Sequence, residues 1–407
     1  MTDAFTARRY RSERRFRLYG VLALGISMLF LSYLLFDIIS KAVPGFVESR
    51  VTLNVSLDAT KIDAANIKGS DFDGLLKETL RAEFPDVTTR GDKKKLTALL
   101  SSAAGDDLRS LVIANPALIG TKVRYPALLS DEADLFLKGV AGGSALDEAK
   151  AKFLAALRDR GDVEKHFALR FFTSGDSREP EQAGILGAVM GSLLALLVTL
   201  GLSVPLGIAA ALYLEEFAPK NRLTDFIEVN INNLAAVPSI IFGLLGLALF
   251  INVFGMPRSA PVTGGLVLAL LVLPTIIIAA RAALRAVPPS IKEAALGVGA
   301  SHQQAVFHHV LPLAVPGILT GIILGVARAL GETAPLLMIG MVAFIVDVPK
   351  GFSDAATVLP VQIFLWSDLP EVAFQARTAG AIVVLLVILF SFNALAIYLR
   401  KRFERRW

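Results

Sequence analysis

The chain contains no cysteine among its 407 residues, which excludes disulfides, thiolate chemistry and cysteine-based metal sites. Only four histidines are present, so a histidine-rich metal site is not expected either. Charged residues make up 19% of the chain, whereas a soluble protein carries about a quarter. The G-x-x-x-x-G-K-[ST] loop that binds nucleotide phosphates is absent. We therefore expect no enzyme, with no catalytic residue, metal or cofactor in this chain.

Hydrophobic residues make up 54% of the sequence, and they are concentrated in long uncharged runs. The runs cover residues 18–40, 183–214, 230–254, 263–280, 313–346 and 378–399. Each run approaches or exceeds the roughly 20 residues that cross a bilayer. The first run follows an arginine-rich arm, as a signal peptide would, but its length favours an uncleaved anchor. The sequence predicts an all-α polytopic membrane protein with six transmembrane helices.

Lysine and arginine indicate how these helices are oriented. They cluster in the N-terminal arm, in the segments 220–222 and 281–292, and in the tail 400–406. By the positive-inside rule, both termini are cytoplasmic. The high pI of about 9.3 therefore reflects the orientation of these helices in a membrane, with contact to lipid and no nucleic acid.

The orientation places residues 44–178 outside the cytoplasmic membrane, between the first helix (within 1–43) and the remaining helices (within 179–407). Apolar residues alternate with polar ones from Val51 to Leu57, which predicts a strand. We expect helices over 71–84 and 146–160 and a second strand over 166–173. These elements predict a small extracytoplasmic α+β domain, which acts as a docking or spacer domain or as a ligand sensor.

A cytoplasmic loop at 290–312 has the local signals of a helical hairpin. Ser290 with Glu293, and Ser301 with Gln304, match the capping-box pattern that opens a helix. Glycine at 297 and 299 permits a left-handed turn between the two helices.

This loop resembles the EAA loop of ABC importer permeases. Glu293, Ala294, Ala295 and Gly299 match its spacing, and the match continues through Leu311 and Pro312 with a departure at His309. The resemblance implies that these four residues couple the chain to a separate ATPase subunit, which uses ATP and Mg.

The fifth run contains two charged residues, Arg328 and Glu332. A lone arginine in the centre of a membrane helix costs about 2.5–3.5 kcal/mol. At a spacing of four residues the two side chains are able to pair, either as a structural ion pair or as a gate for an anion. Asn232 and Asn233 either line the same path or form interhelical hydrogen bonds. Glu215 and Glu216, at the end of the second run, are expected to form a solvated rim, with contact to the ATPase subunit as the alternative.

The string G-E-T-A-P at 331–335, together with the segments 229–243 and 359–364, resembles the A-type permease of phosphate-specific importers (PstA-type). The resemblance covers about 180–407. It implies a MetI-like core, a translocation path containing Arg328, Glu332 and Thr333, and three kinds of partner. These are a homologous second permease, two ATPase subunits and a periplasmic phosphate-binding protein. A permease for another oxyanion or small solute, or a membrane phosphate sensor, remains the alternative.

Overall fold

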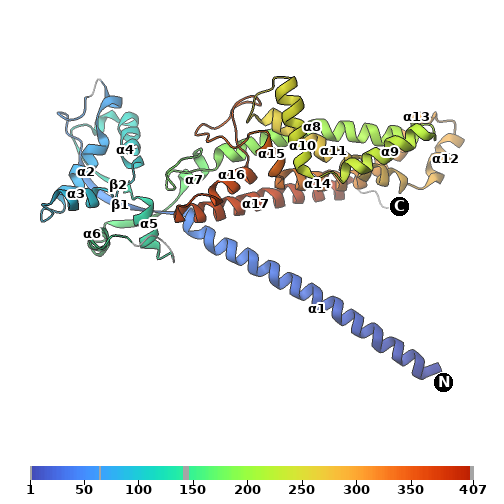
Figure 1. The fold of residues 1–407 in the computed structure, drawn as a ribbon, viewed down its shortest axis with the longest axis horizontal. Helices are drawn as coiled ribbons and strands as arrows, with labels where there is room; N and C mark the ends of the chain where they lie inside the picture. The colour runs from blue at the N-terminus through green and yellow to red at the C-terminus, as the bar shows by residue number, and fades with distance from the viewer. Residues whose placement is uncertain (1, 64–65, 141–145, 404–407) are drawn as a thin grey trace.

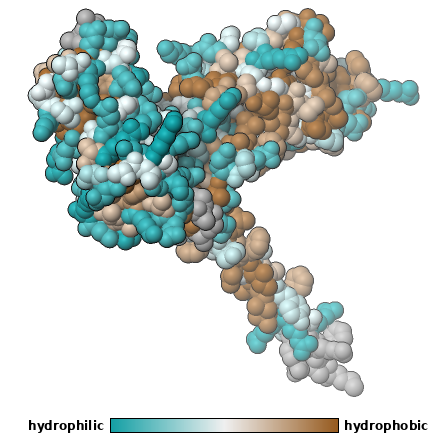
Figure 2. Space-filling model, turned by 60° about the vertical axis from the view of Figure 1, so that its left-hand side comes forward, coloured by the Kyte–Doolittle hydropathy of each residue, from teal (hydrophilic) through white to brown (hydrophobic). Residues whose placement is uncertain are grey.

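The computed structural model describes residues 2–63, 66–140 and 146–403. An N-terminal α+β part and a bundle of long helices meet at the end of α1 (Thr2–Ala42), which diverges from the bundle (Figure 1). Figure 2 shows hydrophobic side chains over the bundle and α1, and hydrophilic ones over the α+β part. This distribution fits a bundle embedded in lipid and an appendage in water.

The α+β part consists of short helices around a small sheet. Its elements are η1 (Val43–Phe46), β1 (Val47–Ser56), η2 (Ile67–Gly69), α2 (Phe72–Ala82), α3 (Arg90–Thr97), α4 (Ala103–Ala114), η3 (Pro116–Leu118), β2 (Lys122–Leu128), α5 (Asp131–Lys138), α6 (Glu148–Asp159), β3 (Val163–Phe167) and α7 (Leu169–Thr173).

The sheet has three antiparallel strands in the order β2-β1-β3. Val51, Leu53 and Val55 of β1 are fully buried, as the alternating pattern predicts. The expected strand over 166–173 is wrong beyond Phe167, because Leu169–Thr173 forms helix α7, whose Phe171 is buried against the bundle. Tertiary packing thus overrides the β propensity of this aromatic segment.

The bundle contains the remaining elements. They are α8 (Leu186–Leu212), η4 (Tyr213–Phe217), α9 (Arg222–Ala235), α10 (Ser239–Gly246), η5 (Leu247–Val253), α11 (Pro261–Arg285), α12 (Pro289–Gly297), α13 (His302–Ala305), η6 (Val306–Val310), α14 (Leu311–Gly331), α15 (Ala334–Met338), α16 (Leu359–Ser367) and α17 (Val372–Phe403). The elements η4, η5 and η6 are π-helical turns.

Five helical segments among the described residues are long and apolar enough to cross a membrane. They are Ser12–Phe46, Leu186–Phe217, Pro261–Arg285, His302–Gly331 and Val372–Arg402. The third expected span is bent by 101° between Arg222–Ala235 and Ser239–Val253, and it makes a sixth only if the pair counts as one span. Pro238 lies at this break, where a proline lacks the N–H that a continuous helix needs.

The fifth apolar run, expected over 313–346, is not one helix. Helix α14 ends at Gly331, Glu332 is extended, and α15 begins at Ala334. Pro335 explains the interruption, because its ring would clash with the carbonyl group four residues earlier.

Three glycines of α14 let this helix approach α11 closely. A Cβ atom built on Gly317 or Gly321 would lie 2.6 or 2.4 Å from the Cβ atom of Ala283 or Ala279, and one on Gly325 would lie 2.7 Å from Val272. Small residues at intervals of four form the close interfaces that membrane helices use.

Arg377 of α17 fastens the α+β part to the bundle. Its buried guanidinium donates hydrogen bonds to the carbonyl oxygens of Gly45 (2.9 Å), Pro180 (3.0 Å) and Glu181 (3.3 Å). Lys138 of α5 donates to the carbonyl oxygen of Pro44 at 2.6 Å. The junction therefore rests on charge-assisted hydrogen bonds to backbone that enters and leaves the α+β part.

Candidate coupling hairpin and charged pair

The segment after α11 forms a hairpin of two short helices, α12 and α13. Gly299 between them has φ +92°, the left-handed conformation that glycine adopts without strain. The Ser301 hydroxyl accepts from the Gln304 amide at 3.3 Å, and the Gln304 side chain accepts from the Ser301 amide at 2.9 Å. This confirms the second capping box.

The capping box expected at Ser290 and Glu293 is wrong. Helix α12 begins at Pro289 with Pro288 as its N-cap, and no side chain caps it. The physical reason is that proline favours the first helical position, which places Ser290 inside the helix. Glu293 is therefore released to the surface, where it is exposed.

The four residues of the expected coupling motif divide between surface and interior. Glu293, Ala294 and Gly299 are exposed, while Ala295 is 6% exposed and packs inward. Three residues of the motif are thus accessible on the hairpin, while one alanine anchors it.

The second arm of the hairpin continues into the bundle without a break. Helix α13, the π-helical turn η6 and α14 form one segment from His302 to Gly331. Arg328 lies in the last turn of α14, at the end opposite His302. The hairpin and Arg328 therefore lie at opposite ends of one continuous helical segment.

The structure brings Arg328 and Glu332 together. Their Nε and Oε1 atoms are 3.7 Å apart, and Nη1 of Arg328 lies 3.4 Å from Oγ1 of Thr275 in α11. The Arg328 side chain is 33% exposed, so donors of its guanidinium remain accessible to an anion. The pair spans the end of α14 rather than one continuous helix face, because Glu332 is already extended.

The other expected path residues lie in different places. Thr333 follows Glu332 and is the N-cap of α15. Asn232 and Asn233 are exposed on α9. Among the described residues, no hydrogen bond joins these two asparagines to Arg328 or Glu332.

Glu215 and Glu216 do not form a solvated rim, and this expectation is wrong. Their side chains are 17% and 10% exposed and pair with basic residues of α11 and α12. The π-helical turn η4 turns them toward these partners. The available signal was charge complementarity, since the segment from 281 to 292 contains Arg281, Arg285 and Lys292.

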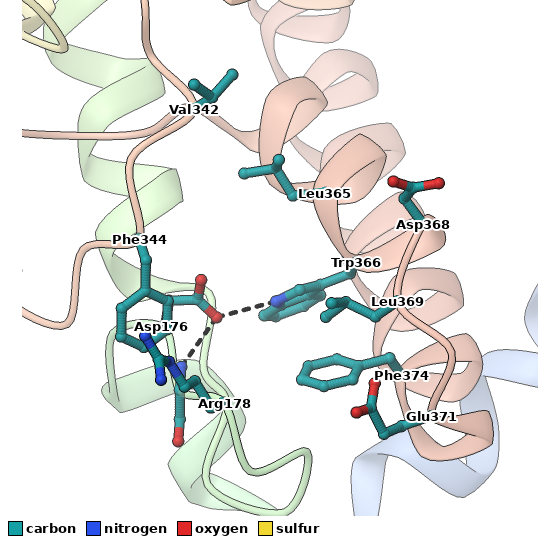
Figure 3. Close-up of a pocket in the computed structure, with 11 residues that line it drawn as sticks. Asp176, Arg178, Val342, Phe344, Leu365, Trp366, Asp368, Leu369, Glu371 and Phe374 are labelled. Atoms are coloured by element: carbon teal, nitrogen blue, oxygen red, sulfur yellow. Dashed lines mark hydrogen bonds between the residues drawn. The ribbon is translucent and has the colours of Figure 1, made fainter.

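A cavity of about 440 Å³ lies at the end of the bundle near the α+β part (Figure 3). Trp366 donates its Nε1–H to Oδ1 of Asp176 at 2.9 Å, and Arg178 lies 5.6 Å from the centre of the Phe344 ring. Burial raises the pKa of the Asp176 carboxyl. Sequence reasoning missed this site because its walls come from three distant segments.

Comparison with known families identifies the bundle. Residues 203–407 match the model described as binding-protein-dependent transport system inner membrane component. The chain belongs to this family. It is a membrane translocation subunit of an ABC importer, not an enzyme. Residues 3–145 match a separate domain of unknown function, DUF3333.

Similar curated proteins cover the same half of the chain. A probable ABC transporter permease protein, YqgI of Bacillus subtilis, is 35% identical over 170 residues, which are 42% of this chain and 58% of that protein. The phosphate transport system permease protein PstA 1 of Mycobacterium tuberculosis H37Rv is 34% identical over 229 residues, 56% of this chain and 73% of that protein. An inward-facing MetNI methionine ABC transporter structure has 16% identity and a TM-score of 0.43, over 55% of this chain and 95% of that one.

Proposed function

We propose that this chain is the inner-membrane permease subunit of an ATP-driven phosphate importer. The main support for phosphate as the cargo is the similarity to phosphate transport system permeases. One such relative is 34% identical over 74% of its length. An accessible guanidinium at Arg328 supports the same conclusion, because its planar fork of donors matches phosphate oxygens.

Glu332 limits how tightly Arg328 binds an anion, as a translocation path requires. A carboxylate 3.7 Å from the guanidinium neutralises it when no anion is present. An entering phosphate must compete with this carboxylate, which weakens its retention and permits release. A path for ions must bind its cargo weakly enough to let it leave.

The coupling hairpin transmits the motion of the ATPase to the permease. The exposed surface of Glu293, Ala294 and Gly299 docks onto an ATPase subunit, and the displacement passes through α13 and α14 to Arg328. ATP is required because moving a dianion inward against 100 mV costs about 4.6 kcal/mol, before any concentration gradient.

The partners follow from this arrangement. A homologous second permease completes the path, two ATPase subunits bind below, and a periplasmic phosphate-binding protein delivers cargo. Exposed apolar side chains on α9, among them Leu223, Phe226 and Val229, support a contact with the second permease or lipid. Both termini lie in the cytoplasm, and the α+β part lies outside as a docking or spacer domain.

Uptake of radiolabelled phosphate tests the proposal in cells that lack this chain. Wild type is expected to restore uptake in the presence of excess sulfate, and Arg328→Ala and Glu293→Ala are expected to abolish it. Arg124→Ala removes an exposed arginine of the α+β part and serves as the matched control. If wild type leaves phosphate uptake unchanged, the cargo is another oxyanion or small solute. If no ATPase co-purifies with the chain, a membrane phosphate sensor becomes the better interpretation.

A further inference from the structure

The cytoplasmic end of the bundle contains a cluster of charged residues that belongs to no part of the EAA motif. We call it the inner cluster, and its members are Glu215, Glu216, Glu228, Arg281, Arg285 and Lys292. They come from four elements, η4, α9, α11 and α12. The inner cluster therefore connects the coupling hairpin to three segments of the bundle.

Glu216 contacts both helices of the hairpin, α12 and α13. Its Oε2 atom accepts a hydrogen bond from Nζ of Lys292 in α12 at 2.5 Å. Its backbone carbonyl lies 2.8 Å from Nε2 of His302, the first residue of α13. The His302 ring also packs edge-on against Phe217, with ring centres 5.1 Å apart. One residue thus contacts the hairpin on each side of the glycine turn.

Glu215 continues the connection into the bundle. Its Oε1 and Oε2 atoms accept hydrogen bonds from Nε of Arg285 at 2.8 and 2.9 Å. Its Oε2 atom also lies 3.5 Å from Nε of Arg281. Arg281 in turn pairs with Glu228 of α9. Helix α9 leads to the bent segment at Pro238, and α11 carries Thr275, the partner of Arg328. Two elements that border the expected path are thus linked to η4.

Stability alone does not account for these ion pairs. Apolar contacts already join η4 to α11 and to the start of the helix after the hairpin, since Leu214 packs in one cluster with Leu284, Val306 and Val310. A buried ion pair contributes little net stability compared with apolar residues of the same volume. Its attested use is to fix one relative arrangement of the elements that it joins. Both η4 and η6 are π-helical turns, which are rare and are frequently found at functional sites.

We propose that Glu216 is a positioning residue that makes the coupling hairpin move as one body with η4, and through Glu215 with α9 and α11. Without it, the ATPase still moves α13 and α14, but η4, α9 and α11 do not follow, so less phosphate is transported per ATP hydrolysed. This inference rests on the proposed function, because it assigns a second route by which the hairpin drives the same permease.

Charge reversal tests the pair in the complete complex with its ATPase. Glu216→Lys and Lys292→Glu, each alone, are expected to lower phosphate transported per ATP hydrolysed about tenfold, within the usual range of coupling free energies. The double variant restores the pair in the opposite sense and is expected to recover the ratio to within about twofold of wild type. The matched control is Glu148→Lys, which breaks an exposed ion pair with Lys152 in α6.

A second measurement does not depend on the cargo. Because the chain has no cysteine of its own, Arg222→Cys in α9 and Val298→Cys in the hairpin take spin labels without background from other positions of this chain. Both positions are exposed. Where Glu216 is intact, the distance between the labels is expected to stay constant when ATP binds. In Glu216→Lys, and in the conservative Glu216→Gln used if the reversal fails to assemble, it is expected to change.

The outcomes are distinguishable. Unchanged transport ratios in both single variants, a double variant that remains uncoupled, or a constant label distance in Glu216→Lys or Glu216→Gln would each overturn the role of Glu216. A wild-type complex that hydrolyses ATP but transports no phosphate overturns the cargo instead, and the label distances still report on Glu216.

Discussion

Replacing Gly321 by alanine tests whether α14 and α11 approach as closely as the structure shows. The new Cβ atom would lie 2.4 Å from the Cβ atom of Ala279. Carbon atoms in favourable contact are about 3.5–4.0 Å apart. Relief therefore requires the two helices to separate by more than about 1 Å, which also loosens the contacts of Gly317 and Gly325.

The expected cost follows from two opposed terms. Overpacking a well-packed interface costs about 1–3 kcal/mol. Alanine is better than glycine within a helix by about 0.8–1.0 kcal/mol, which offsets part of that cost. Gly201→Ala separates these terms, since Gly201 is exposed in α8 and nothing lies within 4 Å of its added Cβ atom. Gly201→Ala keeps the propensity gain and lacks the clash.

The assay is the apparent unfolding midpoint of the purified chain in detergent, measured side by side for the two variants. Gly321→Ala is expected to unfold a few degrees below Gly201→Ala. Phosphate uptake should also fall, because separating the helices lengthens the 3.4 Å contact between Arg328 and Thr275. Equal midpoints and equal uptake would refute the close approach of α14 and α11.

Three further predictions concern other contacts. Ser301→Ala removes the capping hydroxyl at the start of α13 and should lower the stability of this helix by about 1 kcal/mol. Amide hydrogen exchange over 302–306 should become faster, whereas Ser301→Thr should behave like wild type. Arg377→Met leaves three backbone carbonyls without their hydrogen-bond donor. Proteolysis within 174–185 should become faster, and an unchanged rate would contradict the role of Arg377 in attaching the α+β part. Burial raises the pKa of Asp176, so its contribution to stability is present at about pH 4 and lost as the pH rises through the raised pKa. As the pH rises through this range, the unfolding midpoint of wild type should fall relative to that of Asp176→Asn. If the midpoints of the two proteins change in parallel with pH, Asp176 does not contribute in this way.

Sequence patterns predicted those features that depend on neighbouring residues. The membrane-spanning runs follow from uninterrupted apolar stretches. The hairpin follows from the capping pattern at Ser301 and Gln304 and from the glycine turn at Gly299. Strand β1 follows from alternation between Val51 and Leu57. In each case the determining residues belong to one continuous stretch of sequence.

Contacts between distant segments could not be read in this way. Arg285 and Glu215 are 70 positions apart, so only the packing of α8 against α11 brings them together. The interruption after Gly331 has a local signal in Pro335, but a proline within an apolar run indicates a kink as readily as an end. Burial by tertiary contacts similarly decided that Leu169–Thr173 became a helix.

The attachment of the α+β part bears on the choice between a docking or spacer domain and a ligand sensor. Hydrogen bonds run from Ser101 to Glu181 at 2.6 Å and from Gln182 to Ser102 at 2.8 Å. Together with Arg377, they fasten α4 and its flanking residues to the segment that precedes α8. A sensor that signals by moving on the bundle needs a weakly held junction, whereas the hydrogen bonds of Arg377 and the bond between Ser101 and Glu181 are buried. We therefore expect the α+β part to be held rigidly against the starts of α8 and α17, as a docking or spacer domain would be.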